Sequence, residues 1–392
     1  MKIRFSVTQG LTLVLLAACG TESTLDRSEL AFSRFSGQED CRSIPQAPTE
    51  DRRWKEGLGL DVDNEIVGEN IVAYRVQWFS GGWSGWYTPG VADIDWKTTE
   101  DGKARRVWSY FYDHQHEYTI CAGSTLYVDQ GNGSGNEDGT RSHPFLTIQR
   151  AIQESDARIE QYGGVTISVA RGVYREIGDI DIEDRVALIG ENPDTTWVVA
   201  ADPSQHAVIH LRGSAVVSGF TLKSELDAKA GAVFSGNTYG AVLSHTIIRD
   251  TYWGVITYGE ANRIIYNTLV NNEIGLYILS ANDTRIESNI IFGSNLGVAR
   301  VDHSTIAFIY NDVAAVDTPF YGMDDQIGTN GNISVDPQFR DAANGDFHLR
   351  PGSPAIDAGN PCSAFDREPL PNGGRSNLGA YGNTPFATPS GF

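Results

Sequence analysis

A step of about 22 residues recurs in the middle of the chain and constrains its fold more than any other feature. Four polar residues keep this spacing: His245, Asn267, Asn289 and Asn311. Three glycines keep nearly the same step: Gly254, Gly275 and Gly297. The segments between them are short runs of β-forming residues, too short for helices. A repeat of this length predicts a solenoid, in which each repeat is one coil and stacked coils bury a common core. Equivalent asparagines about 4.8 Å apart would form an amide ladder.

The repeat pattern resembles that of a known superfamily. It runs x-x-Ile-x-x-Asn-x-Ile with a following Gly-Val or Gly-Leu, as in the coils of right-handed parallel β-helix proteins of the pectate-lyase-like superfamily. Residues 125–176 resemble the N-terminal segment of such proteins, in which a helix plugs one end of the solenoid. Residues 336–361 and 373–382 resemble their C-terminal closing segment. The resemblance therefore implies an all-β fold: a right-handed parallel β-helix with an N-terminal helix cap and a C-terminal closing segment.

The composition along the chain predicts five parts. They are a lipoprotein signal peptide (1–18), a lipidated cysteine with a flexible tether (19–50), a small Trp-rich β domain (51–123), the β-helix (124–335), and a C-terminal cap and tail (336–392). In 145–152, four apolar residues lie on one helical face, which predicts the capping helix: Phe145, Ile148, Ala151 and Ile152.

The first 18 residues have the composition of a leader. Lys2 and Arg4 precede an apolar run that is too short to span a membrane. The run ends in Leu-Ala-Ala-Cys-Gly, which resembles a bacterial lipobox and implies cleavage before Cys19 and its lipidation. Gly20, where some lipoproteins have Asp, favours the outer membrane by analogy. We therefore expect an exported, lipid-anchored protein at the outer membrane or cell surface. An ordinary signal peptide with an incidental cysteine is the alternative.

Three further cysteines and a cluster of tryptophans mark the next region. An exported protein meets oxidising conditions, so a disulfide is permitted. Cys41 and Cys121 bracket the Trp-rich domain, and we predict that they pair and leave Cys362 over. Six of the eight tryptophans lie in this domain. Trp83 and Trp86 are candidates for stacking on sugars, as in a carbohydrate-binding module, although the tryptophans of so small a domain also serve as its core.

The resemblance places substrates along one strand face and its adjoining turns. Here the strands 255–258, 276–279 and 298–301 would form that face. A uronate lyase or epimerase needs a base for the proton alpha to the carboxylate and a cation for the resulting charge. His303 or Tyr277 is the candidate base. The candidate cation is Arg300, or a calcium ion held by Glu260 and Asp302. The alternative is that all five are ordinary polar residues of exposed strands and turns.

Neither motif nor charge decides the activity. The Gly-His-Gly signature of polygalacturonases is absent, as are the Asp-Pro-His-Asp run of mannuronan epimerases and the Arg-x-Pro-x-x-Arg run of pectate lyases. The net charge of −20 would repel phosphate backbones, which makes nucleic acid an unfavourable partner. Two functions remain for a chain that we expect to be monomeric. The β-helix interacts with polysaccharide, as a binding protein or as a lyase or epimerase. Alternatively, the protein is a non-catalytic adhesin or envelope scaffold that binds carbohydrate through its Trp-rich domain.

Overall fold

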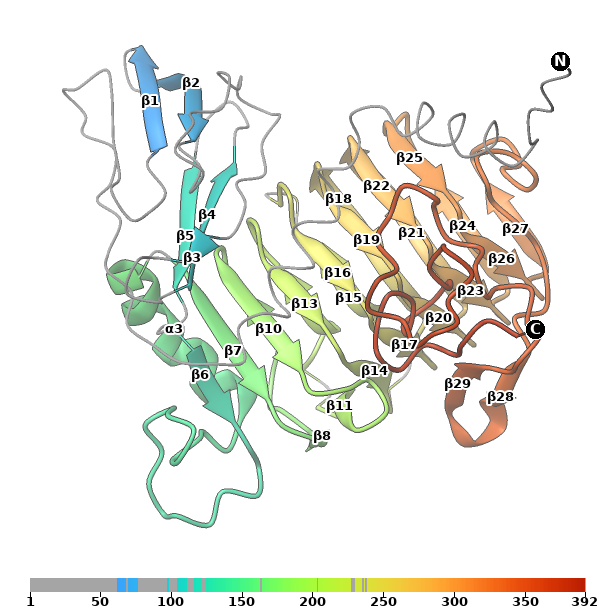
Figure 1. The fold of residues 1–392 in the computed structure, drawn as a ribbon. Coiled ribbons are helices and arrows are strands. Elements are labelled where there is room, and N and C mark those ends of the chain that lie inside the picture. The colour runs from blue at the N-terminus through green and yellow to red at the C-terminus, as the bar shows by residue number, and fades with distance from the viewer. Residues whose placement is uncertain are drawn as a thin grey trace, which may run out of the picture.

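The computed structural model describes residues 125–391, with gaps at 163, 203, 227–229, 235 and 237, and the backbone of five earlier strands. Within the described residues the dominant feature is a stack of parallel coils, each built from three short strands (Figure 1). Equivalent strands of successive coils pair in parallel and form three long sheets. The predicted all-β parallel solenoid is confirmed.

The three sheets are named by the order in which a coil passes through them. The first sheet contains β6 (Thr125–Val128), β7 (Val165–Val169), β10 (Val186–Gly190), β13 (Val216–Ser218), β16 (Val242–Ser244), β19 (Arg263–Ile265), β22 (Thr284–Glu287) and β25 (Ile306–Ile309). The second sheet contains β8 (Gly172–Tyr174), β11 (Thr196–Ala200), β14 (Thr221–Ser224), β17 (Ile247–Arg249), β20 (Thr268–Val270), β23 (Ile290–Phe292) and β26 (Asp312–Ala314). The third sheet contains β9 (Asp181–Ile182), β12 (Ala207–Leu211), β15 (Ala230–Phe234), β18 (Trp253–Glu260), β21 (Ile274–Asn282), β24 (Leu296–Arg300) and β27 (Thr318–Tyr321).

The core runs through the inside of the coils. Side chains alternate between the two faces of a strand, so every coil sends one apolar set inward. Val255, Leu276 and Val298 occupy one register position of the third sheet, and each is at most 1% exposed. Repetition of this pattern over the coils gives one continuous apolar core, as the short repeat predicts.

Asparagines form a buried amide ladder at the turn between the first and second sheets. The Asn267 side chain donates to Asn289 and that of Asn289 to Asn311, at 3.0 and 2.9 Å between N and O. The ladder continues to Asn332. His245 does not belong to the ladder, although its distance of 22 residues from Asn267 predicted that it would. The coil between β16 and β19 is one residue shorter, so His245 is equivalent to Tyr266, on which its ring stacks.

A helix lies at the beginning of the stack, as predicted (Figure 1). It is α3 (Ile148–Tyr162), and its buried residues Ile148, Ala151 and Ile159 join the solenoid core. The buried carboxylate of Glu176 accepts the N–H of Ile148 at 2.8 Å and so caps the helix N-terminus. That the helix closes this end of the solenoid stays a prediction.

The C-terminal segment folds back along the side of the solenoid. It contains the antiparallel pair β28 (Phe339–Asp341) and β29 (Asp346–Leu349), joined by the 3-10 helix η2 (Ala342–Asn344). Its apolar residues, such as Phe347, Leu378 and Tyr381, pack on the outer face of the second sheet. Through these contacts, residues 336–391 cover a side of the stack. The sequence predicted that this segment closes the end of the stack.

The five earlier strands are antiparallel. One pair is β1 (Val62–Val67) with β2 (Asn70–Val76), and a second sheet joins β3 (Lys97–Thr98), β4 (Ala104–Tyr110) and β5 (His116–Cys121). The small β domain predicted for 51–123 and its boundaries stay predictions.

Candidate functional site

The outer face of the third sheet carries half-exposed aromatic side chains. Ile256, Tyr277, Ala299 and Tyr321 occupy one register position in successive coils, opposite to the inward-facing positions. Tyr321 is 61% exposed and Tyr277 is half-buried. At the start of β18, Tyr252 packs edge-on against Trp253 with ring centres 4.4 Å apart, and Tyr252 is 41% exposed. We call Tyr252, Trp253, Ile256, Tyr277 and Tyr321 the aromatic face.

The structure separates the predicted base Tyr277 from the predicted cation Arg300. Tyr277 is in register with Ala299, whereas Arg300 is in register with Ile278, whose side chain is fully buried. Arg300 is half-buried, its Nε is buried without a hydrogen-bond partner, and its Nη1 donates to the Ser304 carbonyl at 3.5 Å. The two residues therefore do not converge on one outward face.

The predicted acids and His303 occupy the turns at the ends of the strands. Both carboxylate oxygens of Asp302 are engaged, because Oδ2 accepts the N–H of Ser280 and Oδ1 accepts that of Ser304 at 3.0 Å. Burial raises the pKa of Asp302, but the hydrogen bonds from Ser304 and Ser280 outweigh it and leave the pKa below its usual value. Asp302 therefore organises the turn. His303 is exposed.

The structure gives no support to the predicted calcium ligands. Glu260 is in register with Asn282, one coil before the turn that contains Asp302. Equivalent residues two coils apart are separated by about 10 Å, whereas calcium lies about 2.3–2.6 Å from the oxygens that bind it. Within the residues that the structure describes, no three His, Cys, Asp or Glu side chains form a metal-binding group. Calcium binding at Glu260 and Asp302 stays a prediction.

Four predicted residues lie outside the described residues: Cys19, Cys41, Trp83 and Trp86. Cys121 ends β5, but its side chain lies outside the description too. Cys362 is disulfide-bonded, so the expectation that it is left over is wrong. Its partner must be one of the other three cysteines if the bond is internal. With an internal bond, lipidation of Cys19 and pairing of Cys41 with Cys121 exclude each other, and each of them stays a prediction.

Sequence reasoning missed a charged cluster at the beginning of the third sheet's outer face. His210 occupies the same register position as Val233, Ile256 and Tyr277 in the following coils. Its Nε2 lies 3.9 Å from Asp179, and His206 is bonded to the same carboxylate at 2.9 Å. Burial lowers the pKa of His210 although Asp179 opposes it, so the imidazole is neutral near pH 7. The alternation of inward and outward residues in 207–211 was the only sequence signal for it.

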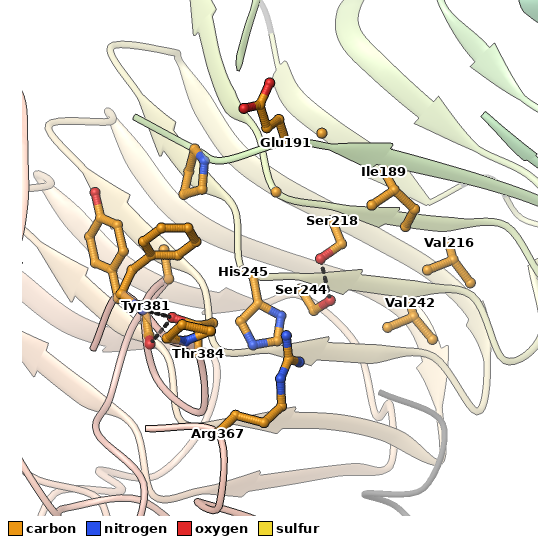
Figure 2. Close-up of a pocket in the computed structure, with 16 residues that line it drawn as sticks. Ile189, Glu191, Val216, Ser218, Val242, Ser244, His245, Arg367, Tyr381 and Thr384 are labelled. Carbon is orange, nitrogen blue, oxygen red and sulfur yellow. Dashed lines mark hydrogen bonds between the residues drawn. The ribbon is translucent and has the colours of Figure 1, made fainter. Parts of the chain in front are cut away.

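Sequence reasoning also missed a cavity of about 220 Å³ under the C-terminal segment (Figure 2). One wall is the outer face of the first sheet, with Ile189, Val216 and Val242. The other wall is the C-terminal segment, with Arg367 and Phe386 among its residues. The sequence of this segment predicts a closing element, and nothing in it indicates a cavity.

His245 lines this cavity. It is 7% exposed, and its Nε2 donates to the carbonyl of Gly382 at 3.1 Å. Its pKa is lowered to about 3, mainly by burial and also by the nearby Arg367, against the effect of the Gly382 carbonyl. The imidazole is therefore neutral, and His245 acts as a structural link between a coil and the C-terminal segment.

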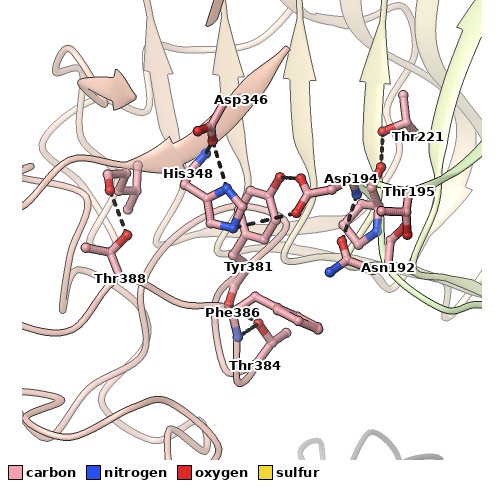
Figure 3. A network of polar contacts seen from close by, with 12 residues as sticks. Asn192, Asp194, Thr195, Thr221, Asp346, His348, Tyr381, Thr384, Phe386 and Thr388 are labelled. Atoms are coloured by element: carbon pink, nitrogen blue, oxygen red, sulfur yellow. Dashed lines mark hydrogen bonds and ion pairs between the residues drawn. The ribbon is translucent and has the colours of Figure 1, made fainter. Parts of the chain in front are cut away.

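A second polar link holds the segment next to the cavity (Figure 3). The Tyr381 hydroxyl donates to Asp194, which follows β10. Burial raises the pKa of Tyr381 far above its ordinary value, so the hydroxyl stays protonated. The His348 ring stacks on Tyr381 at 3.8 Å between centroids and lies 2.8 Å from Asp346 and 3.8 Å from Asp194. The cluster fixes the wall of the cavity.

Comparisons with known proteins find likeness in solved structures alone. No protein-family model and no curated protein matches the chain. Pectin methylesterase PemA from Erwinia chrysanthemi is 11% identical, with a TM-score of 0.30 over 57% of this chain and 98% of that chain. A rhamnogalacturonan lyase is 12% identical, with a TM-score of 0.31 over 54% of this chain and 66% of that chain.

The A-module of a mannuronan C-5 epimerase from Azotobacter vinelandii is 15% identical, with a TM-score of 0.23 over 48% of this chain and 78% of that chain. Likeness of this degree carries no argument about activity. Among the residues that the structure describes, no helix is both long and apolar enough to cross a membrane. The three parallel sheets and the buried amide ladder give the described residues a parallel β-solenoid fold, while its right-handed winding and its place in the pectate-lyase-like superfamily stay predictions.

Proposed function

We propose that this protein binds polysaccharide along the outer face of its third sheet. The aromatic face carries this proposal, because Tyr277 and Tyr321 stand two coils apart on one outward register position. Two strand spacings put them about 10 Å apart. Tyrosine and tryptophan offer flat apolar rings with a polar edge, which suits stacking on sugar rings at little cost in side-chain entropy. Exposed groups of this kind on a monomer mark an interaction surface.

Binding without turnover is the function that the geometry favours. Among the described residues, the predicted base Tyr277 and the predicted cation Arg300 do not meet on the aromatic face, since Arg300 is in register with the buried Ile278. Neutral glycans meet no electrostatic penalty on a chain of net charge −20, whereas polyuronates do. We propose neutral or weakly charged glycans as the ligands, and an exported, lipid-anchored monomer as the form in which the protein acts.

A lyase or epimerase is the second candidate, and His210 favours it. A neutral imidazole beside a carboxylate on the outward face has the form of a general base. Arg212 supplies a cation near His210, and it is bonded to Asp181 at 2.8 Å and lies 3.5 Å from Glu183. Because two carboxylates already neutralise it, Arg212 is poorly placed to stabilise the charge of a uronate.

A glycan panel separates the two candidates. Purified full-length protein is incubated with neutral glycans and polyuronates, with calcium and with chelator, while binding and the absorbance of unsaturated uronates are followed. We expect saturable binding without growth in absorbance. Absorbance that grows, and is lost in His210→Ala but kept in His303→Ala, would establish the second candidate. Failure to bind any glycan would contradict both.

A further inference from the structure

The cavity under the C-terminal segment is a separate site from the aromatic face. It lies on the first sheet, and its second wall comes from residues more than a hundred positions later in the chain. The aromatic face lies on the third sheet. The cavity volume of about 220 Å³ is smaller than the roughly 300–1,000 Å³ of pockets for drug-sized ligands, so the space suits one small molecule.

Most of the cavity wall is apolar. Val216 and Val242 are in register on neighbouring strands, and both belong to a small apolar cluster outside the main core. Ile189 packs against this cluster and is half-buried. Phe386, which is 45% exposed, and Pro385 line the cavity from the C-terminal segment. Such walls favour a ligand with an apolar body.

The polar groups of the wall are few, and several are already bonded. Thr384 donates through Oγ1 to the Tyr381 carbonyl at 2.6 Å, and His245 donates to Gly382. Ser244 donates to Ser218 at 3.2 Å, which leaves the Ser218 hydroxyl hydrogen for a ligand. A ring with many hydroxyls would therefore find few partners here, and each buried hydroxyl without one costs about 1–3 kcal/mol.

Arg367 is the exception among these polar groups. It is half-buried, and no hydrogen bond or ion pair among the described residues involves its guanidinium. Its side chain extends toward His245 in Figure 2, and that neutral imidazole carries no negative charge to balance the guanidinium. The other charged residue of the wall, Glu191, accepts the N–H of Arg171 at 3.1 Å and is exposed. A guanidinium held next to apolar walls favours a planar anion that it can bind through two parallel hydrogen bonds.

We propose that this cavity binds a small monocarboxylate with an apolar, ring-sized body, with the carboxylate on Arg367 and the Ser218 hydroxyl and the body against Val216, Val242 and Phe386. The acidic chain would repel polyanions, and one cation in the wall matches one negative charge. The site does not depend on polysaccharide binding at the aromatic face.

Titration calorimetry with the full-length protein tests this proposal. The probe is 3-phenylpropanoate, with 3-phenylpropanamide as the neutral isostere and galacturonate as the sugar acid. We expect saturable binding of one phenylpropanoate, at least about tenfold tighter than the amide and than galacturonate, which corresponds to about 1.4 kcal/mol. Equal binding of acid and amide, tighter binding of galacturonate, or no binding of the acid would each overturn the proposal.

Two variants locate the site. Arg367→Met keeps the apolar stem and removes the charge, so we expect at least about tenfold weaker binding. Arg141→Met, at an exposed arginine outside the cavity, is the matched control and should bind as the unmodified chain does. Val216→Phe fills the cavity from the outer face and should abolish binding, with circular dichroism to verify the fold. Unchanged affinity in both Arg367→Met and Val216→Phe would overturn the proposal.

Crossed measurements keep the two sites apart. Tyr277→Ala should leave phenylpropanoate binding unchanged, and Arg367→Met should leave glycan binding unchanged. Loss of phenylpropanoate binding in Tyr277→Ala would place the probe on the aromatic face and refute the cavity as its site.

Discussion

The side-chain amide of Asn267 donates to Oδ1 of Asn289 in the next coil, and this oxygen also accepts the backbone N–H of Asn267 at 2.9 Å. Asn289 in turn donates to Asn311 and to the carbonyl of Ile264 at 2.7 Å. Asn289 is 1% exposed, so water cannot replace these bonds. The Asn289 side chain thus satisfies two backbone groups of the preceding coil and links the side chains of the coils on either side of its own.

Asn289→Ala should lower the free energy of unfolding by about 3 kcal/mol, since it leaves several buried polar groups without partners. Denaturant midpoints at pH 7 measure this. The control is Asn295→Ala, at an exposed asparagine that directly precedes β24 in the same coil, which should change stability by less than about 0.5 kcal/mol. Similar midpoints for the two variants would contradict a structural role of the ladder.

Burial of Glu368 should make the chain less stable as the pH rises. Burial raises its pKa to about 7, against the N–H groups of Asn377 and Asn383 that it accepts. The folded value exceeds the unfolded value of about 4.3, so the folded state binds the extra proton. The contribution of Glu368 is therefore full below about pH 4 and is lost as the pH rises through about 7.

Glu368→Gln keeps the accepting oxygen and removes the titration. We expect it to match the unmodified chain near pH 4 and to exceed its stability at pH 8 by about 3 kcal/mol. Glu154→Gln, at an exposed surface pair with Arg150, should show no such divergence. A constant difference across this pH range would refute the raised pKa.

Tyr381→Phe should loosen the C-terminal segment. It removes a buried hydroxyl that donates to Asp194, which costs about 1–2 kcal/mol. Hydrogen exchange should accelerate at the N–H groups of Leu378 and Ala380, which bond to Ala355 and Thr268. Tyr321→Phe, at a 61% exposed tyrosine, should leave exchange unchanged. Equal exchange in the two variants would show that the Asp194 contact does not hold the segment.

The cysteine connectivity can be read by peptide mapping without reduction. If Cys19 carries lipid, its sulfur is blocked, and we expect Cys362 in one peptide pair with Cys41 or Cys121. A bond between Cys19 and Cys362 would instead refute lipidation. Mass analysis of the mature N-terminus gives an independent check of the same point.

The repeat predicted the solenoid correctly because it depends on local sequence features. Short β-forming runs, turn residues and one buried amide per coil recur with the coil itself, so the sequence revealed the sheets around Asn267 and Asn289. The 22-residue spacing wrongly aligned His245 with Asn267. The coil that begins at β16 is one residue shorter and its strands still pair with those of the next coil, so His245 aligns with Tyr266. Spacing alone cannot tell a register shift from a change in turn length.

The candidate sites were harder to predict because they depend on contacts distant in sequence. Asp302 and Arg300 fall in the expected coils, but strand alternation turns Arg300 away from Tyr277, and two serines occupy the Asp302 carboxylate. The cavity joins Val216 to Arg367 across about 150 residues. No local pattern marks Arg367, since its significance comes from the absence of a partner within the described residues.

The most direct test of the central proposal is glycan binding by Tyr277→Ala, Tyr321→Ala and the double variant, with Tyr277→Phe and Ile177→Ala as controls. Ile177 is 81% exposed and does not belong to the aromatic face. Stacking predicts about five- to tenfold weaker binding for each alanine variant, about 1 kcal/mol, and near-complete loss in the double variant. Tyr277→Phe keeps the ring and should keep most of the affinity. Unchanged glycan affinity in the double variant would contradict binding at the third sheet.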